Sequence, residues 1–314
     1  MSLFSVFSAV VMAAEMIISP IPDSIVSPVT VYPAVSFGQL SGAKTPATAS
    51  VLGVSATTTS SPTPTRSPTP TLRSTTDVSP KDVASESGTK RTSRKKQYTI
   101  AFLGDSMVDT LGPDVPHTKK ALSALYPGTS FTMLNFGVGA TNIDYGLQRV
   151  SNGYDYLGKA IPSVVSQRPD IVVVESFGYN PYSFDTGALD KHWLQLAAIV
   201  DSLKAQLPGV RIVIAATIAP NSKVFGDGAA GLAFDPADKV RRTTTIKQYL
   251  DSTVKFAKSQ KLPLADAFHA SIDSSGDGKL TYINGGDHIH YSDNGRILFG
   301  SKVAEAIAVN RLLE

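Results

Sequence analysis

The sequence predicts an α/β domain in which helices cover both faces of a parallel sheet. From residue 97 onward, short apolar runs alternate with longer amphipathic stretches, and this alternation is typical of repeated strand–helix units. The apolar runs are also continuous, as in residues 171–174, which favours parallel strands that are buried on both faces. Right-handed crossovers would place the connecting helices on the two sides of the sheet.

Five candidate strands follow one another in this part of the chain. They cover residues 98–104, 131–137, 170–176, 211–218 and 262–268. Helices are expected where apolar residues recur at every third or fourth position, over residues 190–207, 239–260 and 292–313. Ligands of such folds bind beyond the carboxyl ends of the strands, so the functional residues are expected there.

The region before the domain has a different composition. Residues 1–22 contain an apolar stretch, 3–19, with about the length that spans a bilayer, although no Lys or Arg precedes it and Glu15 interrupts it. We expect a signal anchor, with a disordered hydrophobic leader as the alternative. Residues 23–96 are expected to be a disordered linker, since their Ser/Thr/Pro-rich sequence offers too little apolar surface to fold.

This organisation predicts a domain of residues 97–314 on a stalk outside the cytoplasm, either tethered to a membrane through residues 3–19 or secreted. Residues 1–96 carry nine Lys or Arg and five Asp or Glu, whereas residues 97–314 carry 20 and 21. The domain is therefore almost neutral, which argues against a nucleic-acid surface. The chain has no cysteine, which excludes disulfides, cysteine nucleophiles and thiolate metal sites. We expect a monomer.

Ser106 follows the first strand, in "GDS", and is a candidate nucleophile. A serine nucleophile needs a base, and the base needs a group that orients it. The chain has five histidines. Asp287 and His290 lie three residues apart before the last helix, a separation at which the carboxylate reaches Nδ1 of the imidazole and leaves Nε2 for the serine. Alone, Asp287 would be interpreted as a cap or turn residue and His290 as a surface histidine.

The other histidines are expected to affect stability at most. His117 follows a proline in a predicted loop, His192 opens a predicted helix, and His269 lies at a predicted strand end. His288 stands only one residue from Asp287, so the spacing favours His290 as the base.

Acyl chemistry also needs an oxyanion hole, in which N–H groups meet the developing negative charge. Three candidate donors follow three predicted strands: the backbone N–H of Ser106, a glycine N–H in "NFGVGATN" (135–142) and the amide of Asn180. In the glycine segment, Gly137 and Gly139 compete for the role. The glycine segment (135–142) and the segment with Asn180 (176–181) could each also be an ordinary turn.

These residues together resemble the SGNH hydrolases, also called GDSL-like esterases. "GDSMVDTLG" resembles the first of four family blocks, "NFGVGAT" the second, "FGYN" the third and "DHIH" the last. The resemblance assigns Ser106 as nucleophile, Gly139 and Asn180 with Ser106 as oxyanion donors, and Asp287 with His290 as the remaining catalytic residues. It departs at Pro181, where the family often has Asp after the asparagine.

The resemblance implies a flavodoxin-like three-layer α/β/α fold, ester hydrolysis through an acyl-serine, and no metal or other cofactor. The substrate would be a small ester or an acylated glycan with a short acyl group, such as acetyl. Two alternatives remain: an O-acyltransferase that uses the same residues, and a non-catalytic surface module that binds glycans.

Three further patterns carry less weight. No Gly-x-Ser-x-Gly elbow occurs in residues 97–314, which argues against the α/β-hydrolase fold. "GVGATN" (137–142) resembles a dinucleotide-binding loop but lacks its final glycine. "DSSGDGKLTYIN" (273–284) resembles a calcium loop, yet Asn284 stands where a bidentate carboxylate is needed, so a structural turn is expected.

Overall fold

A five-stranded sheet forms the centre of the structure. The computed structural model describes residues 90–182 and 187–314. Within them the sheet has the strand order β2-β1-β5-β6-β7, and every neighbouring pair is parallel. The strands are β1 (Gln97–Gly104), β2 (Ser130–Gly137), β5 (Ile171–Glu175), β6 (Arg211–Ala216) and β7 (Leu264–Asp266). All five lie within a residue or two of the predicted strands, so the predicted parallel sheet is confirmed.

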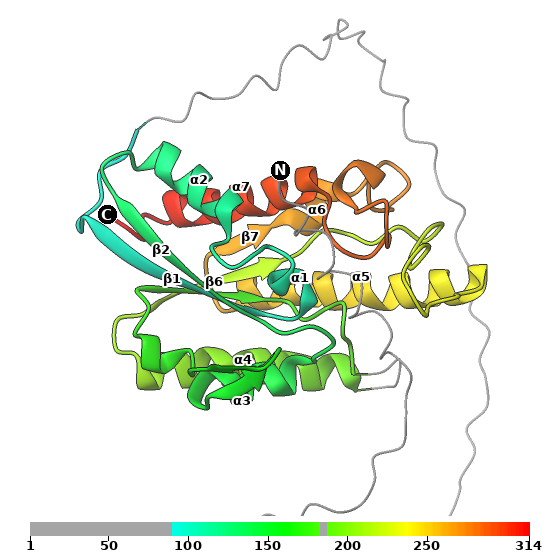
Figure 1. Cartoon of the computed structure of the whole chain (residues 1–314), viewed down its shortest axis with the longest axis horizontal. Coiled ribbons are helices and arrows are strands. Elements are labelled where there is room, and N and C mark those ends of the chain that lie inside the picture. Colours follow the sequence, from blue (N-terminus) through cyan, green and yellow to red (C-terminus); the bar gives the residue numbers. More distant parts are fainter. Residues whose placement is uncertain (1–89, 183–186) are drawn as a thin grey trace, which may run out of the picture. The chain divides into compact units, whose positions relative to one another are not determined.

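Helices cover both faces of this sheet, as the sequence predicts. In Figure 1, α2 and α7 lie on one side of the sheet, while α3 and α4 lie on the other. Helix α5 packs beside α4, where the rings of Trp193 and Phe256 meet edge to face with centroids 5.2 Å apart. The long helices are α2 (Pro116–Leu125), α3 (Ile143–Ser151), α4 (Ala188–Gln206), α5 (Pro236–Ser259) and α7 (Asp293–Val309).

Short elements complete the described part of the chain. They are the helices α1 (Ser106–Asp109) and α6 (Ala267–Ser271), a hairpin of β3 (Tyr154–Tyr156) and β4 (Lys159–Ile161), and single 3-10 turns at Val165–Gln167 and Leu280–Tyr282. Strands β3 and β4 pair only with each other, as a separate antiparallel sheet.

The middle of the sheet is buried on both sides because β1 and β5 contain continuous apolar runs. In β1, Ile100 and Phe102 belong to the core under α2 and α7. Ala101 and Leu103 alternate with them and belong to the core under α3 and α4. All four side chains are fully buried. Side chains of successive strand residues point to opposite faces, so the continuous apolar run is what a doubly covered strand requires.

The sequence pattern missed α2, α3 and the β3–β4 hairpin, all of them short. His117 therefore lies in α2 and not in a loop, and Pro116 occupies the first helical turn, a position that suits proline. Helix α3 is capped by Asn142, whose side chain accepts a hydrogen bond of 3.1 Å from the N–H of Asp144. These two capping features were the available sequence signals for the missed helices.

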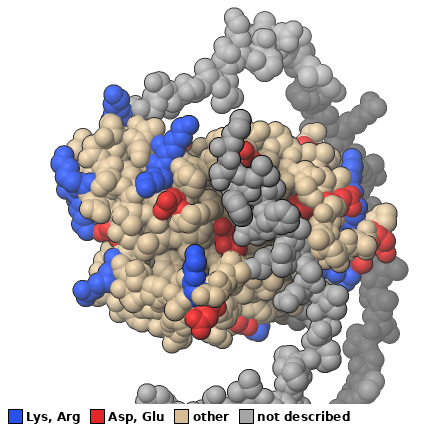
Figure 2. Space-filling view, viewed as in Figure 1, with Lys and Arg blue, Asp and Glu red and all other residues tan. Residues whose placement is uncertain are grey.

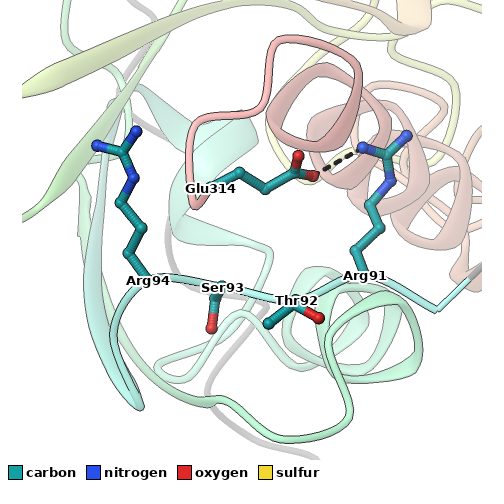
Figure 3. A pocket seen from close by; sticks show the side chains of 5 residues that line it. All are labelled: Arg91, Thr92, Ser93, Arg94 and Glu314. Atoms are coloured by element: carbon teal, nitrogen blue, oxygen red, sulfur yellow. Dashed lines mark hydrogen bonds and ion pairs between the residues drawn. The ribbon is translucent and has the colours of Figure 1, made fainter.

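The folded part begins before Gln97, which corrects the expected end of the linker. The backbone N–H of Arg91 donates to Leu125 and that of Arg94 to Leu313, each over 2.8 Å. The guanidinium of Arg91 also pairs with Glu314 at 2.8 Å, as Figure 3 shows. Residues 91–94 and Glu314 line a hollow of about 600 Å³ that contains none of the predicted site residues.

Residues 90–96, the basic segment "KRTSRKK", lie at the end of the sheet where β1 and β2 start. Ser130, the first residue of β2, donates its N–H to the carbonyl of Lys96 over 2.9 Å, and Lys95 forms an ion pair with Asp170 just before β5. Figure 2 shows Lys and Arg side chains at this edge of the molecule, on the left of the view.

The predicted leader and the linker up to residue 89 lie outside the described residues. No helix of the described part has the length and apolar character needed to cross a membrane.

Candidate active site

The strand register gathers the predicted site residues around the carboxyl end of β1. Gly104, the last residue of β1, is paired with Gly137 at the end of β2. On the other side, Leu103 is paired with Val174 of β5. The chain segments that follow these three strands contain Ser106, Gly139 and Asn180. The chain passes from β1 to β2 on one side and then from β2 to β5 on the other side of β1. Such a switch point is where open α/β sheets bind ligands.

Ser106 is the first residue of α1, directly after a tight strand-to-helix turn. Asp105 caps this helix, and its carboxylate accepts a hydrogen bond of 2.8 Å from the N–H of Met107. Gly104 is needed here, since a Cβ at this position would lie 2.3 Å from Val108 and 2.8 Å from the Cβ of Glu175. Helix α1 has only one turn, so its dipole is small. We therefore expect the backbone N–H of Ser106, and not the helix dipole, to attract negative charge here. N–H groups in the first turn of a helix have no acceptor within the helix.

Asp287 and His290 are joined by the hydrogen bond that their spacing predicts. Nδ1 of His290 lies 2.8 Å from Oδ2 of Asp287, and the other carboxylate oxygen accepts the N–H groups of Ile289 and His290 at 2.9 and 3.0 Å. Burial alone would raise the pKa of Asp287, but the hydrogen bond and the charge of His290 outweigh it and leave that pKa below its usual value. Nε2 of His290 is buried without a hydrogen-bond partner among the described residues.

Two tertiary contacts hold the His290 loop beside α1. The hydroxyl of Tyr291 lies 2.6 Å from that of Thr217, just beyond β6. Arg296 of α7 donates from Nε to the carbonyl of Thr110, the residue that ends α1, over 3.0 Å. The charge of His290 is also close enough to lower the pKa values of Asp105 and Asp109, although burial raises both overall. These two carboxylates lie on either side of Ser106 in the sequence.

The structure distinguishes the two glycines that compete for the oxyanion hole. The N–H of Gly137 already bonds to the side chain of Asn135 at 2.8 Å, and a Cβ at Gly137 would lie 2.1 Å from the backbone N of Asp109. Gly137 is thus a packing residue under α1. A Cβ at Gly139 would lie 4.0 Å from the Cβ of Ser106, so Gly139 is the glycine that borders Ser106.

Asn180 is held in place by Asp105. Its amide nitrogen donates to Oδ2 of Asp105 over 2.9 Å, and Asp105 is fully buried. Burial raises the pKa of Asp105, while the hydrogen bonds from Met107 and Asn180 work in the opposite direction. A primary amide has two N–H groups, so the bond to Asp105 fixes the side chain and leaves a second donor for a ligand.

Two buried ionisable residues that the sequence analysis missed, Arg149 and Glu175, support these segments. The guanidinium of Arg149 donates to the carbonyls of Phe136 and Gly104, over 2.6 and 3.0 Å, and so ties the ends of β2 and β1 together. Glu175 accepts the N–H of Phe177 over 2.9 Å and bonds to the hydroxyl of Ser176. Burial, and next the carboxylate of Asp105, raise the pKa of Glu175 well above its usual range, which favours the protonated acid.

The remaining histidines lie elsewhere. His269 belongs to α6, not to a strand end, and bonds to Asp266 at 2.8 Å. His192 is buried in α4, with Nε2 at 2.7 Å from the carbonyl of Ser176, and burial lowers its pKa to about 4. Nδ1 of His288 lies 2.7 Å from the carbonyl of Asp227.

The segment that resembles a calcium loop is a hydrogen-bonded turn. One carboxylate oxygen of Asp273 accepts from the N–H of Ser275 at 2.8 Å and from that of Asp277 at 3.1 Å. Asp277 in turn pairs with Lys247. No group of three or more His, Asp or Glu side chains in the described ranges is arranged to hold a metal ion.

A comparison with solved structures finds several chains that this chain resembles. The chain is 19% identical to the lipase/acylhydrolase from Enterococcus faecalis, over 68% of this chain and 96% of that one, with a TM-score of 0.49. It is 14% identical to a GDSL-like lipase from Bacteroides thetaiotaomicron, over 68% and 89%, with a TM-score of 0.48. With the acetylxylan esterase Axe2 from Geobacillus stearothermophilus the identity is 16%, over 67% and 94%, with a TM-score of 0.42. A comparison with curated proteins finds no match.

The sequence profile of the GDSL-like Lipase/Acylhydrolase family matches residues 102–296. This range is more than half of the chain and contains the four sequence blocks quoted above, from Ser106 to His290. The resemblance inferred from those blocks is thereby confirmed. The chain is an ester-hydrolysing enzyme and belongs to the GDSL-like lipase/acylhydrolase family.

Proposed function

We propose that this enzyme cleaves carboxylic esters with Ser106 as nucleophile, His290 as base and Asp287 as the group that orients the base. The observation that carries the proposal is the unpartnered, buried Nε2 of His290, on a ring whose Nδ1 is fixed by Asp287 at 2.8 Å. A buried polar atom without a partner costs free energy unless a ligand or reacting group satisfies it.

The residues then act in a standard acyl-transfer sequence. Nε2 of His290 accepts the proton of the Ser106 hydroxyl as its oxygen attacks the ester carbonyl, and Asp287 stabilises the imidazolium that results. The N–H groups of Ser106 and Gly139 and the Asn180 amide donate to the oxyanion. His290 returns the proton to the departing alcohol, which leaves an acyl-serine. His290 then takes a proton from water, which attacks the acyl-serine. The carboxylic acid is released and the proton returns to Ser106.

We also propose that the acyl group is short, such as acetyl, and that it is carried by a glycan or a small ester. Membership of the GDSL-like lipase/acylhydrolase family supports this assignment. A set of p-nitrophenyl esters from acetate to octanoate tests it. We expect kcat/KM to fall as the chain lengthens, and a maximum at octanoate would contradict a short-acyl site.

The assignment of the nucleophile is tested with a fluorophosphonate probe, which reacts with activated serines. The probe should add its mass to the peptide that contains Ser106, and Ser106→Ala should abolish both labelling and turnover. Labelling of another serine, or undiminished turnover in Ser106→Ala, would contradict the proposal.

Adding a sugar acceptor to the assay distinguishes hydrolysis from transfer: a hydrolase releases free acid, and a transferase forms the acylated sugar.

For the location of the enzyme, the proposal rests on sequence alone. The apolar stretch 3–19 and the Ser/Thr/Pro-rich stretch 55–70 favour a tethered or secreted enzyme outside the cytoplasm, acting as a monomer. Membrane fractionation of cells that express the full chain, with residues 90–314 as the control, tests the tether. Recovery of both proteins in the soluble fraction of the cell would contradict it.

A further inference from the structure

The hydroxyl of Tyr156 lies against Gly139, the glycine that borders the proposed nucleophile. Tyr156 is the last residue of β3, and its hydroxyl oxygen accepts the N–H of Gly139 over 3.1 Å. The same hydroxyl donates to Oδ2 of Asp109 over 2.8 Å. Asp109 lies three residues after Ser106 on α1, so the phenol bridges the glycine segment and the helix of the nucleophile.

This arrangement creates a conflict with the proposed chemistry. Gly139 is a proposed oxyanion donor, yet its N–H is already bonded to a phenol oxygen. A phenol has a single proton to donate, and that proton goes to Asp109. The oxygen that faces Gly139 therefore acts as an acceptor, as the carbonyl oxygen of an ester would. Burial raises the pKa of Tyr156 to about 12, so the phenol keeps its proton at neutral pH.

We propose that Tyr156 competes with the carbonyl oxygen of the substrate for the N–H of Gly139 and is displaced when the ester binds. This inference rests on the proposed function, because it takes Gly139 as an oxyanion donor. Tyr156 is then a residue that determines substrate access: an ester reacts only if its interactions at the site exceed those of the phenol.

The element that carries Tyr156 is suited to such a displacement. Strands β3 and β4 pair only with each other and with no strand of the central sheet. Leu157, next to Tyr156, forms the turn of the hairpin with Gly158 and is 62% exposed. The start of the hairpin is fixed, since the ring of Tyr154 packs edge to face on Tyr145, with centroids 6.0 Å apart, and lies over the guanidinium of Arg149.

The test compares Tyr156→Phe with the wild type. This change removes the competing oxygen and keeps the ring. A hydrogen bond of this kind contributes about 0.5–1.5 kcal/mol net, so we expect kcat/KM for p-nitrophenyl acetate to rise about 2- to 10-fold. A residue that only supports the fold would give a loss or no change. Tyr126→Phe is the matched control, because its hydroxyl lies 3.5 Å from Glu314 at the other end of the domain, and it should leave kcat/KM unchanged.

A second measurement does not depend on turnover. Hydrogen exchange of the Gly139 amide, followed by NMR, should be faster in Tyr156→Phe than in the wild type and in Tyr126→Phe. An unchanged or lower kcat/KM in Tyr156→Phe, or an unchanged Gly139 exchange rate, would overturn the inference. A wild-type protein without esterase activity or Ser106 labelling would instead refute the proposed function, and the exchange rates would still decide whether the phenol covers this N–H.

Discussion

At the residue level, the chain contains two Asp-x-x-His pairs with the same hydrogen bond, and of these two histidines only His290 has a buried ring nitrogen without a partner among the described residues. In both Asp266–His269 and Asp287–His290, Nδ1 and Oδ2 are 2.8 Å apart. The His269 side chain is 50% exposed, whereas that of His290 is 22% exposed. The local sequence therefore builds the hydrogen bond in both places. The tertiary fold buries the side chain of His290 more than that of His269.

This duplication gives a matched test of the base. We expect His290→Ala to lower kcat about 10,000-fold or more, since the loss of a triad histidine removes proton transfer altogether. His269→Ala breaks an equivalent bond and should leave kcat unchanged, and His288→Ala should keep most of the activity. Steady-state kinetics on p-nitrophenyl acetate measure all three. A large loss in His269→Ala or His288→Ala, with activity retained in His290→Ala, would place the base elsewhere.

Asn180 is expected to act on the transition state more than on substrate binding. A neutral ester gains little from the amide, but an oxyanion accepts a charge-assisted hydrogen bond from it. Asn180→Ala should therefore lower kcat about 100- to 1,000-fold with little change in KM. A variant with near-normal kcat would show that Asn180 serves only as a turn residue before Pro181.

The charge variant Asn180→Asp should be worse for a structural reason. Its carboxylate would replace a donor that now lies 2.9 Å from Oδ2 of the buried Asp105. Two carboxylates at this distance repel each other, so one must bind a proton or the segment must move. We expect a lower unfolding temperature for Asn180→Asp than for Asn180→Ala, in addition to the loss of kcat. Equal unfolding temperatures would contradict the close contact with Asp105.

The residues of the site differ in how far the sequence could predict them. The spacing of Asp287 and His290 determines a local hydrogen bond, and that geometry was predictable. The local pattern alone does not choose between Gly137 and Gly139. The family resemblance favours Gly139, and the contact of Gly137 with the backbone of Asp109 is visible only in the fold. Tyr156 was also not predictable, since it belongs to no sequence block and reaches Gly139 only through the fold.

At the level of elements, burial decided which parts the sequence could predict. Strands β1, β5 and β6 contain continuous buried apolar runs, and the three longest helices, α4, α5 and α7, are long enough to be recognised as helical stretches. Helix α2 and the β3–β4 hairpin are short and partly exposed, so their apolar residues are too few to form a pattern. The hairpin is the element from which Tyr156 reaches the site, so the least predictable element carries a residue of functional interest.

The contact between α1 and the end of β2 gives a test at this level. A Cβ at Gly137 would meet the backbone of Asp109 at 2.1 to 2.6 Å, and backbone atoms cannot rotate away. Gly137→Ala should destabilise the domain by about 1–3 kcal/mol, the usual cost of overpacking, and should lower kcat by moving α1 with Ser106. Urea unfolding measures the first effect and ester turnover the second.

Gly128 provides the control for this change. A Cβ at Gly128, in the loop before β2, would meet no atom within 4 Å. Gly128→Ala should keep both stability and kcat. If Gly137→Ala were as stable and as active as Gly128→Ala, the close packing of α1 on β2 would not be required to position Ser106.

At the level of the whole molecule, the two ends of the folded part meet at the edge of the sheet where β1 begins, opposite the candidate site. Residues 91–96 contact the C-terminal residues 313 and 314, whereas Ser106 follows the other end of β1. Composition alone assigned residues 90–96, "KRTSRKK", to the linker, because charged residues without an apolar pattern resemble a solvated tail. Their backbone hydrogen bonds to the domain are long-range and have no signature in the local sequence.

This arrangement predicts that the start of a truncated protein affects stability and leaves the chemistry intact. Residues 90–314 should match the full chain in kcat/KM on a soluble ester. Removing residues 90–96 as well deletes three backbone hydrogen bonds, between Arg91 and Leu125, Arg94 and Leu313, and Lys96 and Ser130. At about 1 kcal/mol each, their loss should lower the unfolding midpoint by about 6–12 °C. Because the deleted contacts are far from Ser106, kcat/KM of residues 97–314 should be unchanged below that midpoint. Equal midpoints for the proteins that start at 90 and at 97 would show that the basic segment does not stabilise the domain.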